Sequence, residues 1–148
     1  MFQVRIYILT LRKYPKRGKG YYAYRLETVT GSGKVHEKEV YEEELEITAN
    51  QLALVAMYHA LEELKCPCEV EIYTDSLYLR SNYVDNLQTW AENGWKNAKK
   101  EKVANEHLWK EIYQITRKHV IRFNAEYQWS ARARMTHELL ERRMNDVG

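Results

Sequence analysis

The sequence has few residues that could crosslink the chain or anchor it in a membrane. Its two cysteines stand in Cys66-Pro67-Cys68, where one intervening residue is too few for the usual zinc-ligand spacing and no second Cys/His pair follows. Residues 1–5 lack the apolar core of a secretory signal. No apolar run approaches the roughly 20 residues that span a bilayer. We therefore expect an intracellular, cytoplasmic protein with no membrane partner.

An excess of charge of one sign is also missing, because the net charge is only +2 over 148 residues. Composition alone therefore gives no argument for a nucleic-acid partner. The distribution of charge is more informative, since bases gather in residues 12–19 and 95–102 and acids in residues 37–46. Such a separation is typical of a protein with one basic face. Chance clustering on a solvated surface is the alternative.

The composition suits one domain that spans residues 1–148. Hydrophobic residues make up 45% and aromatic residues 12% of the chain, so a single core can form without disulfides or a structural metal. Strands are expected at residues 3–11, 21–29, 34–43, 69–74 and 119–127, and helices at residues 50–64, 77–92, 105–118 and 135–144. Their order, β-β-β-α-β-α-α-β-α, predicts an α/β (mixed α+β) fold with a mixed five-stranded sheet flanked by helices.

Three segments resemble type 1 ribonuclease H in sequence and in spacing. Residues 73–80 (YTDSLYLR) look like the family's strand-to-helix junction. Residues 94–109 (GWKNAKKEKVANEHLW) resemble its basic protrusion and the helix after it, whose bacterial pattern is close to GWKTADKKPVKNVDLW. Residues 48–53 (TANQLA) occupy the place of the family's helix start, TNNRME. The chain is identified as a member of this family over essentially its whole length, which implies a ribonuclease H-like sheet and helices.

The resemblance also implies which positions should carry catalytic carboxylates. The family hydrolyses RNA with two divalent metal ions, and these need several carboxylates that converge on one spot. The four positions fall, in chain order, on Leu9 or Thr10, on Ala53, on Asp75, and on His137 or Leu139. The loop at residues 129–134, where the family has a mobile histidine, contains none. Asp75 is the one retained carboxylate and is insufficient alone, so we expect no cleavage and no cofactor.

A rebuilt metal site is the alternative to a lost one. Asp75 and His137 are weak candidate ligands for a softer ion such as Mn²⁺, with Glu138 beside them. Such a site would make the chain a Mn-dependent endoribonuclease of RNA/DNA hybrids, with Mg²⁺ or Mn²⁺ as its cofactor.

The positions that contact nucleic acid in the family are better retained. Hybrid recognition uses the shallow minor groove, the 2′-hydroxyls and the phosphates. The resemblance implies contacts by Thr48, Asn50, Ser76, Trp95, Lys96, Lys99, Lys100 and Lys102. Thr48 and Ser76 are also expected to cap the helices that follow them. Ala49 and Asn86 replace a family asparagine and a family tryptophan that touch the duplex, so two contacts are lost.

Two further groups are a basic loop and a pair of tryptophans. The loop at residues 12–19 is basic where the family's loop is Gly-rich, and we expect Lys16, Arg17 and Lys19 to contact phosphate in place of metal. Trp90 and Trp109 match the family's aromatic frame, and packing between helices is the simpler role for both.

Three functions remain open. The first is a module that binds RNA/DNA hybrid or duplex RNA through a basic face without cleaving it. The second is a protein-interaction scaffold that no longer binds nucleic acid, which the losses at Ala49 and Asn86 favour. The third is the Mn-dependent nuclease. Because a fold does not fix a function, the choice depends on the site residues, and they favour the first.

Overall fold

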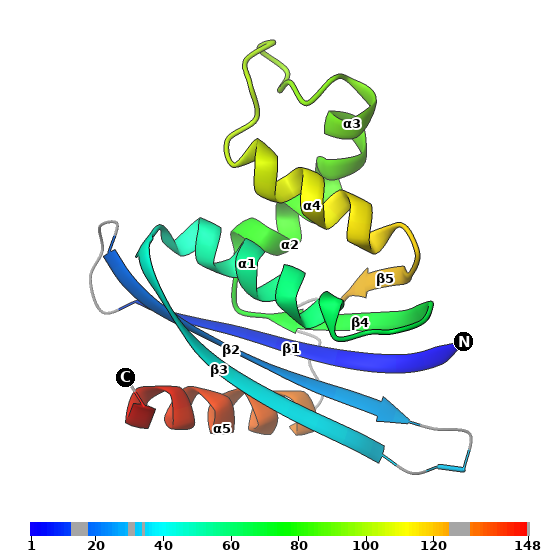
Figure 1. Cartoon of the computed structure of the whole chain (residues 1–148), viewed down its shortest axis with the longest axis vertical. Helices are drawn as coiled ribbons and strands as arrows, with labels where there is room; N and C mark the ends of the chain where they lie inside the picture. The colour runs from blue at the N-terminus through cyan, green and yellow to red at the C-terminus, as the bar shows by residue number, and fades with distance from the viewer. Residues whose placement is uncertain (13–17, 30–31, 34, 125–130, 148) are drawn as a thin grey trace.

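Five strands form one mixed sheet (Figure 1). The structure is a computed structural model that describes residues 1–12, 18–29, 32–33, 35–124 and 131–147. The strands are β1 (Phe2–Arg12), β2 (Gly18–Val29), β3 (Val35–Ile47), β4 (Cys68–Thr74) and β5 (Val120–Phe123), in the order β3-β2-β1-β4-β5. The β1–β2 and β2–β3 pairs are antiparallel, whereas the β1–β4 and β4–β5 pairs are parallel. The predicted mixed sheet is confirmed.

Helices cover both faces of this sheet. They are α1 (Ala49–Glu62), α2 (Leu77–Asp85), α3 (Leu87–Glu92), α4 (Glu106–Thr116) and α5 (Ala131–Val147). In Figure 1, α1 and α4 lie above the sheet and α5 lies below it. Among the described residues, no helix is long and apolar enough to cross a membrane.

The single helix predicted for residues 77–92 is wrong, because Asn86 divides it into α2 and α3. Asn86 has φ −124° and ψ −31°, outside helical values. Its side-chain Nδ2 donates to Oδ1 of Asn82 at 2.8 Å. Asparagine side chains compete with the helix for local hydrogen bonds, which explains the break. The order of elements is therefore β-β-β-α-β-α-α-α-β-α.

Two other boundaries differ from the prediction. The loop predicted at residues 129–134 overlaps α5, which begins at Ala131, because the Ala-Arg-Ala-Arg sequence there has high helix propensity. The third strand continues past residue 43 to Ile47. Residues 125–127 of the predicted fifth strand lie outside the described residues.

The core has a layer on each face of the sheet. Along β1, Ile6 and Ile8 pack into the cluster under α1 and α4. The alternate residues Tyr7 and Leu9 pack into a smaller cluster with α5. Each such buried large side chain contributes about 1.5–3 kcal/mol. The alternation of side chains along β1 therefore fixes helices to both faces.

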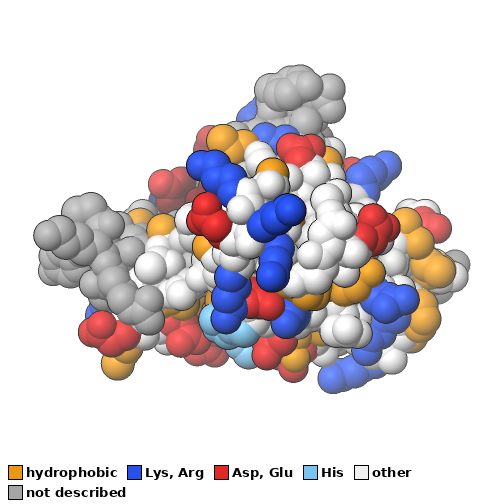
Figure 2. All heavy atoms as spheres, turned by 90° about the horizontal axis from the view of Figure 1, so that it is seen from above, with side chains coloured by type: hydrophobic (Ala, Val, Ile, Leu, Met, Phe, Trp, Pro, Cys, Tyr) orange, Lys and Arg blue, Asp and Glu red, His pale blue; other side chains and the backbone are white. Residues whose placement is uncertain are grey.

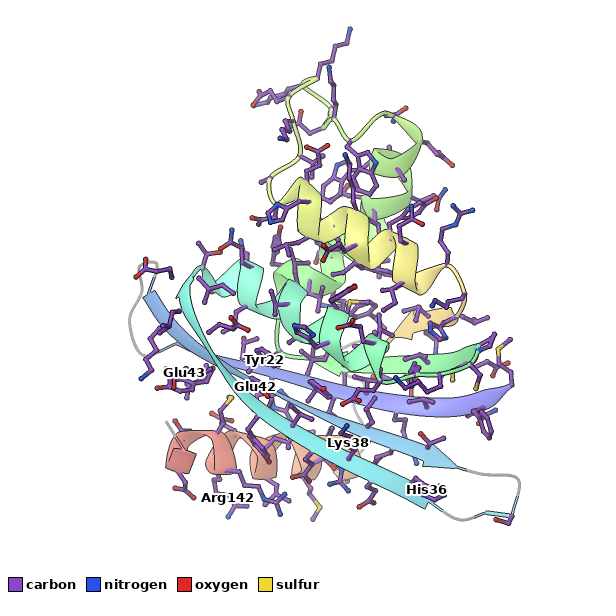
Figure 3. All side chains as sticks on the ribbon, in the orientation of Figure 1. Tyr22, His36, Lys38, Glu42, Glu43 and Arg142 are labelled. Carbon is purple, nitrogen blue, oxygen red and sulfur yellow. The ribbon has the colours of Figure 1, made fainter. Side chains whose placement is uncertain are left out.

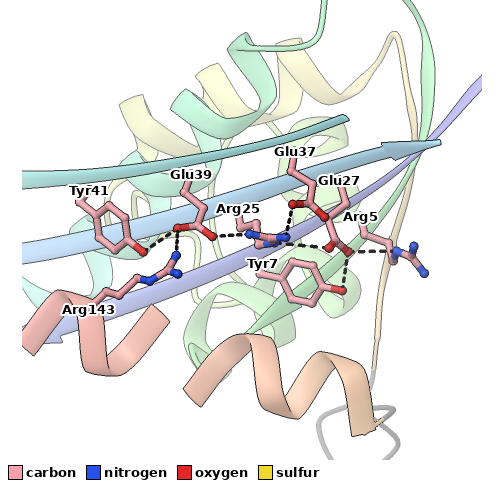
Figure 4. Close-up of polar contacts among 8 residues, drawn as sticks. All are labelled: Arg5, Tyr7, Arg25, Glu27, Glu37, Glu39, Tyr41 and Arg143. Atoms are coloured by element: carbon pink, nitrogen blue, oxygen red, sulfur yellow. Dashed lines mark hydrogen bonds and ion pairs between the residues drawn. The ribbon is translucent and has the colours of Figure 1, made fainter. Parts of the chain in front are cut away.

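A buried carboxylate lies on the face covered by α5 (Figure 4). Glu27 on β2 is 1% exposed. The hydroxyl of Tyr7 donates to its Oε1 at 3.0 Å. Nε of Arg25 lies 3.3 Å from Oε2, and Nε of Arg5 lies 3.4 Å from Oε1. These partners replace the water that the carboxylate loses on burial.

Ion pairs continue from this carboxylate to α5. Arg25 also pairs with Glu37 and Glu39, and Arg143 of α5 pairs with Glu39. Partial burial opposes ionisation of Glu39, but the Tyr41 hydroxyl and Arg143 outweigh it and lower the pKa of Glu39. We call the connected residues Arg5, Arg25, Glu27, Glu37, Glu39 and Arg143 the ion-pair network. It connects α5 to the sheet in addition to the apolar contacts.

Candidate nucleic-acid interface

Three strands end at the same edge of the sheet. β4 is parallel to β1, and β3 has the direction of β1 because both are antiparallel to β2. Ile8 pairs with Thr74, and the residues that follow this last pair are Leu9, still within β1, and Asp75, just after β4. The chain leaves β3 for Thr48 at this same edge, on the left in Figure 1. The fold thus places the ends of three strands on the same side of the sheet.

Two of the four expected carboxylate positions hold buried apolar side chains. Leu9 is 2% exposed and belongs to the cluster with α5. Ala53 on α1 is fully buried. Asp75 is exposed and directly follows β4. Thr10, the other register for the first position, is half-buried and is not an acid.

Helix α5 determines which residue faces the site at the fourth position. Leu140 and Met144 are buried against the sheet, and the helical repeat places the half-buried His137 on the same side. Leu139 is 37% exposed. Glu138 is exposed and lies about 160° around the helix from Leu140. Glu138 therefore points away from the side of α5 that packs against the sheet.

These side chains do not fit the metal pair of the family. Two hard divalent ions need several oxygen ligands at one place, and the side chains of Leu9 and Ala53 contain no ligand atom. Within the residues that the structure describes, no group of three or more His, Cys, Asp and Glu side chains is placed to hold a metal ion. Asp75 with His137 makes a smaller donor set than the family chemistry requires.

The two predicted helix caps are confirmed. Oγ1 of Thr48 accepts a hydrogen bond from N of Gln51 at 3.1 Å, and Oε1 of Gln51 accepts one from N of Thr48 at 3.2 Å. Oγ of Ser76 accepts one from N of Leu79 at 3.1 Å. Each capping hydroxyl still has a proton to donate to a phosphate or a 2′-hydroxyl. Asn50 is exposed on the first turn of α1.

Residues 95–102, here called the basic protrusion, form the top of the molecule in Figure 1. Oδ1 of Asn97 accepts hydrogen bonds from N of Lys99 at 2.9 Å and from N of Glu101 at 3.0 Å. Trp95 and Lys100 both have φ of 64°, in the left-handed region. This backbone is unfavourable for residues other than glycine. The internal hydrogen bonds therefore hold the protrusion in one bent shape.

The left-handed backbone of Lys100 gives a stability prediction. Lys100→Gly is expected to raise the free energy of unfolding by about 0.5–1 kcal/mol, because glycine adopts this φ without a Cβ penalty. Urea unfolding measures the change. Lys99→Gly is the control, since Lys99 is not among the residues with positive φ and glycine there only adds unfolded-chain entropy. Equal effects of the two substitutions would contradict the strain explanation.

Three lysines of the basic protrusion are available for a ligand. Lys96, Lys99 and Lys100 are exposed and form no ion pair with another described residue. Lys102 lies 3.3 Å from Glu106, so this predicted contact already has a partner. Figure 2, which views the molecule from the side of the protrusion, shows Lys and Arg side chains along the middle of this face.

The tryptophans divide between core and surface. Trp109 is fully buried, and its ring lies edge-on to that of Trp90 at 5.7 Å between centroids. Packing between helices is therefore confirmed for this pair. Trp95 is half-buried at the start of the protrusion, with Nζ of Lys110 5.8 Å from its ring centroid. Asn86, at the place of the family's wedge tryptophan, is half-buried and bonded within α2.

The second basic element is described only in part. Lys16 and Arg17 lie outside the described residues. Nζ of Lys19 lies 3.0 Å from Oε1 of Glu43, and the hydrogen bond to Glu43 raises the pKa of Lys19. Figure 3 shows Glu42 and Glu43 together near the end of β3. A phosphate at Lys19 would have to compete with Glu43, so the predicted role of Lys19 is less favourable than the sequence indicates.

The sequence did not identify Gln51 and Asn105, two side chains that lie beside the proposed nucleic-acid contacts. Nε2 of Gln51 donates to Oδ1 of Asn105 at 3.1 Å, although 54 residues separate them. The capping pattern Thr-x-x-Gln predicts the role of Gln51 in the cap. No local sequence pattern predicts the hydrogen bond between Gln51 and Asn105.

Comparison with known proteins agrees with this geometry. The family model for RNase H matches residues 12–126. The chain belongs to the RNase H family. It is 45% identical over 89 residues to Ribonuclease H of Acetivibrio thermocellus, an alignment that covers 60% of this chain and 60% of that protein. The chain thus matches about three fifths of the length of this curated RNase H relative.

Solved structures of other proteins have the same fold. LC9-RNase H1, a type 1 RNase H with the type 2 active-site motif, superposes with a TM-score of 0.75 at 21% identity, over 93% of this chain and 69% of that chain. The foamy viral protease-reverse transcriptase, solved in complex with an RNA/DNA hybrid, superposes with a TM-score of 0.67 at 19% identity, over 93% of this chain and 19% of that chain.

Proposed function

We propose that this chain binds RNA/DNA hybrid, or another duplex that contains RNA, through its basic face and does not cleave it. One contrast carries the proposal. The lysines that can neutralise phosphate are exposed and unpaired among the described residues, whereas Leu9 and Ala53 stand where the metal ligands should be. Cations that can contact phosphate are therefore present, whereas two of the expected metal-ligand positions carry apolar side chains.

The contacts available suit a nucleic-acid backbone. The ammonium groups of Lys96, Lys99 and Lys100 can each neutralise a phosphate and release a counterion. The hydroxyls of Thr48 and Ser76 can donate to phosphates or 2′-hydroxyls. The foamy viral relative of this fold was solved with a hybrid, and that ligand class is the one we propose here.

Absence of cleavage follows from the chemistry of the donor set. Phosphodiester hydrolysis with two metal ions requires that both the attacking water and the leaving oxygen be activated. Asp75 and His137 supply one carboxylate and one imidazole, and Glu138 lies on the exposed side of α5. We therefore propose that neither Mg²⁺ nor Mn²⁺ is a resident cofactor of this chain.

Fluorescence anisotropy of a labelled RNA/DNA hybrid tests binding. We expect a dissociation constant on the order of micromolar at low salt. If three lysines contact three phosphates, the slope of log K against log salt is about −2.7, and affinity falls roughly 40-fold between about 50 and 200 mM salt. Added EDTA is expected to leave the affinity unchanged, because no metal takes part.

Cleavage is assayed on the same hybrid with Mg²⁺ and with Mn²⁺. We expect no product above the protein-free rate with either ion. Mn²⁺-dependent product would overturn the non-cleaving proposal and point to Asp75 and His137, and Asp75→Asn should then abolish it. Binding lost on addition of EDTA would likewise contradict the proposal.

A protein-interaction scaffold is the second candidate, and the surroundings of Asn86 favour it. The amide of Asn86 is bonded to Asn82 within α2 rather than turned outward, and Ala49 has no polar side chain. Two contacts with a duplex are therefore missing. If the hybrid does not bind at low salt, this candidate replaces the first.

A further inference from the structure

We propose that Gln51 and Asn105 are positioning residues that hold three nucleic-acid-contacting elements at a fixed spacing. The inference rests on the proposed function, because it assigns a role to side chains that lie between the proposed contacts. Neither residue is itself one of those contacts.

The side chain of Gln51 joins two helices. Its Oε1 accepts from N of Thr48 at 3.2 Å, inside the cap of α1. Its Nε2 donates to Oδ1 of Asn105 at 3.1 Å. Because the cap occupies the amide oxygen, the amide nitrogen must face Asn105, and this fixes the orientation of both amides.

Asn105 continues this connection into the core. It follows the basic protrusion and directly precedes α4. Its Nδ2 donates to the hydroxyl oxygen of Tyr78 at 3.2 Å, and Nε1 of Trp109 donates to the same oxygen at 3.0 Å. Trp109 is fully buried, so this series of hydrogen bonds ends on a side chain fixed in the core. We call Gln51, Asn105, Tyr78 and Trp109 the polar chain.

The polar chain also supports an unfavourable backbone. Asn105 has φ of 61°, in the left-handed region. Residues other than glycine keep such a conformation only when surrounding contacts over-determine it. The bonds from its side chain to Gln51 and Tyr78 supply such contacts at the base of the protrusion.

Three elements that carry proposed contacts are tied together in this way. They are the start of α1 with Asn50, the start of α2 with Ser76, and the base of the protrusion next to Lys102. A duplex presents its phosphates at a fixed spacing. Contacts on separate elements engage together only when the elements keep a matching spacing, and losing simultaneous engagement costs affinity without removing any contact. The polar chain therefore sets how many contacts act at once.

Asn105→Gly breaks the polar chain while suiting the backbone, because glycine adopts positive φ freely. We expect its affinity for a labelled RNA/DNA hybrid to fall roughly tenfold or more, with little change in the thermal unfolding temperature. Amide hydrogen exchange of Lys99 and Glu101 in the free protein should become faster. A role in global stability alone would lower the unfolding temperature and leave the affinity unchanged at temperatures well below unfolding.

Asn105→Asp is the matched variant that preserves the chain. One Asp oxygen accepts from Nε2 of Gln51, and the other accepts from the hydroxyl of Tyr78, which reverses the sense of that bond. The added charge is controlled by Ala104→Asp at the exposed neighbouring position. We expect Asn105→Asp to bind no more weakly than Ala104→Asp.

The outcomes separate this inference from the proposed function. Wild-type affinity in Asn105→Gly overturns the inference, as does a loss in Asn105→Asp that exceeds the loss in Ala104→Asp and matches the loss in Asn105→Gly. If the wild-type chain binds no hybrid at low salt, the proposed function fails, and hydrogen exchange alone decides. Faster exchange in Asn105→Gly, restored in Asn105→Asp, then supports the positioning role, and unchanged exchange refutes it.

Discussion

Reversing Lys96, Lys99 and Lys100 to glutamate is expected to abolish hybrid binding, with a loss of affinity of at least about 100-fold at low salt. Three exposed ammonium groups without a described counterion become three carboxylates that repel phosphate. The remaining slope of log K against log salt should be smaller in magnitude by about 2.7, since roughly 0.9 counterions are released per neutralised phosphate. Anisotropy titrations at several salt concentrations measure both quantities.

A control with the same change of charge separates local contact from net charge. Lys65, Arg117 and Lys118 are exposed and follow the C-terminal ends of α1 and α4, whereas the basic protrusion adjoins the start of α4. Their reversal to glutamate alters net charge equally and should weaken binding far less. If both triple variants lose affinity to the same extent, the protrusion is not the binding surface. The slope of log K against log salt would then reflect only the overall electrostatic potential of the protein.

The sequence was sufficient to predict the sheet because each strand has a strong local signal. In β1, the alternation of Ile6 and Ile8 with Tyr7 and Leu9 matches the two core layers. The division of α2 from α3 was missed, since periodicity runs through Asn86 and only its backbone conformation and its bond to Asn82 reveal the break. Propensity is a weak prior within one helical turn.

The sequence predicted which residues belong to the candidate site, but it did not predict their ion-pair and hydrogen-bond partners. The resemblance identifies the lysines of the protrusion, but the partners of Lys102 and Lys19 decide which cations are available. The Lys19–Glu43 pair depends on the β2–β3 register. The bond between Gln51 and Asn105 spans 54 residues. Contacts of this kind arise from tertiary packing, which local patterns do not contain.

Glu27→Ala is expected to lower the free energy of unfolding by about 3–5 kcal/mol, because it breaks a buried charge network. The carboxylate is 1% exposed and is contacted by Tyr7, Arg5 and Arg25. Its removal leaves the buried Tyr7 hydroxyl without this acceptor and leaves a cavity beside two guanidinium groups. Urea unfolding followed by far-UV circular dichroism measures the loss.

Two further variants identify the cause of that loss. Glu27→Gln keeps an acceptor for Tyr7 and removes only the charge, so we expect a smaller loss of about 1–2 kcal/mol. Glu69→Ala removes an exposed glutamate from β4 and should change stability by less than about 0.5 kcal/mol. Equal losses for Glu27→Ala and Glu69→Ala would mean that the carboxylate is not buried as described. Glu27→Gln retains the hydrogen bond from Tyr7, whereas Glu27→Ala does not. Equal losses of stability in these two variants would therefore assign the whole effect to the lost charge.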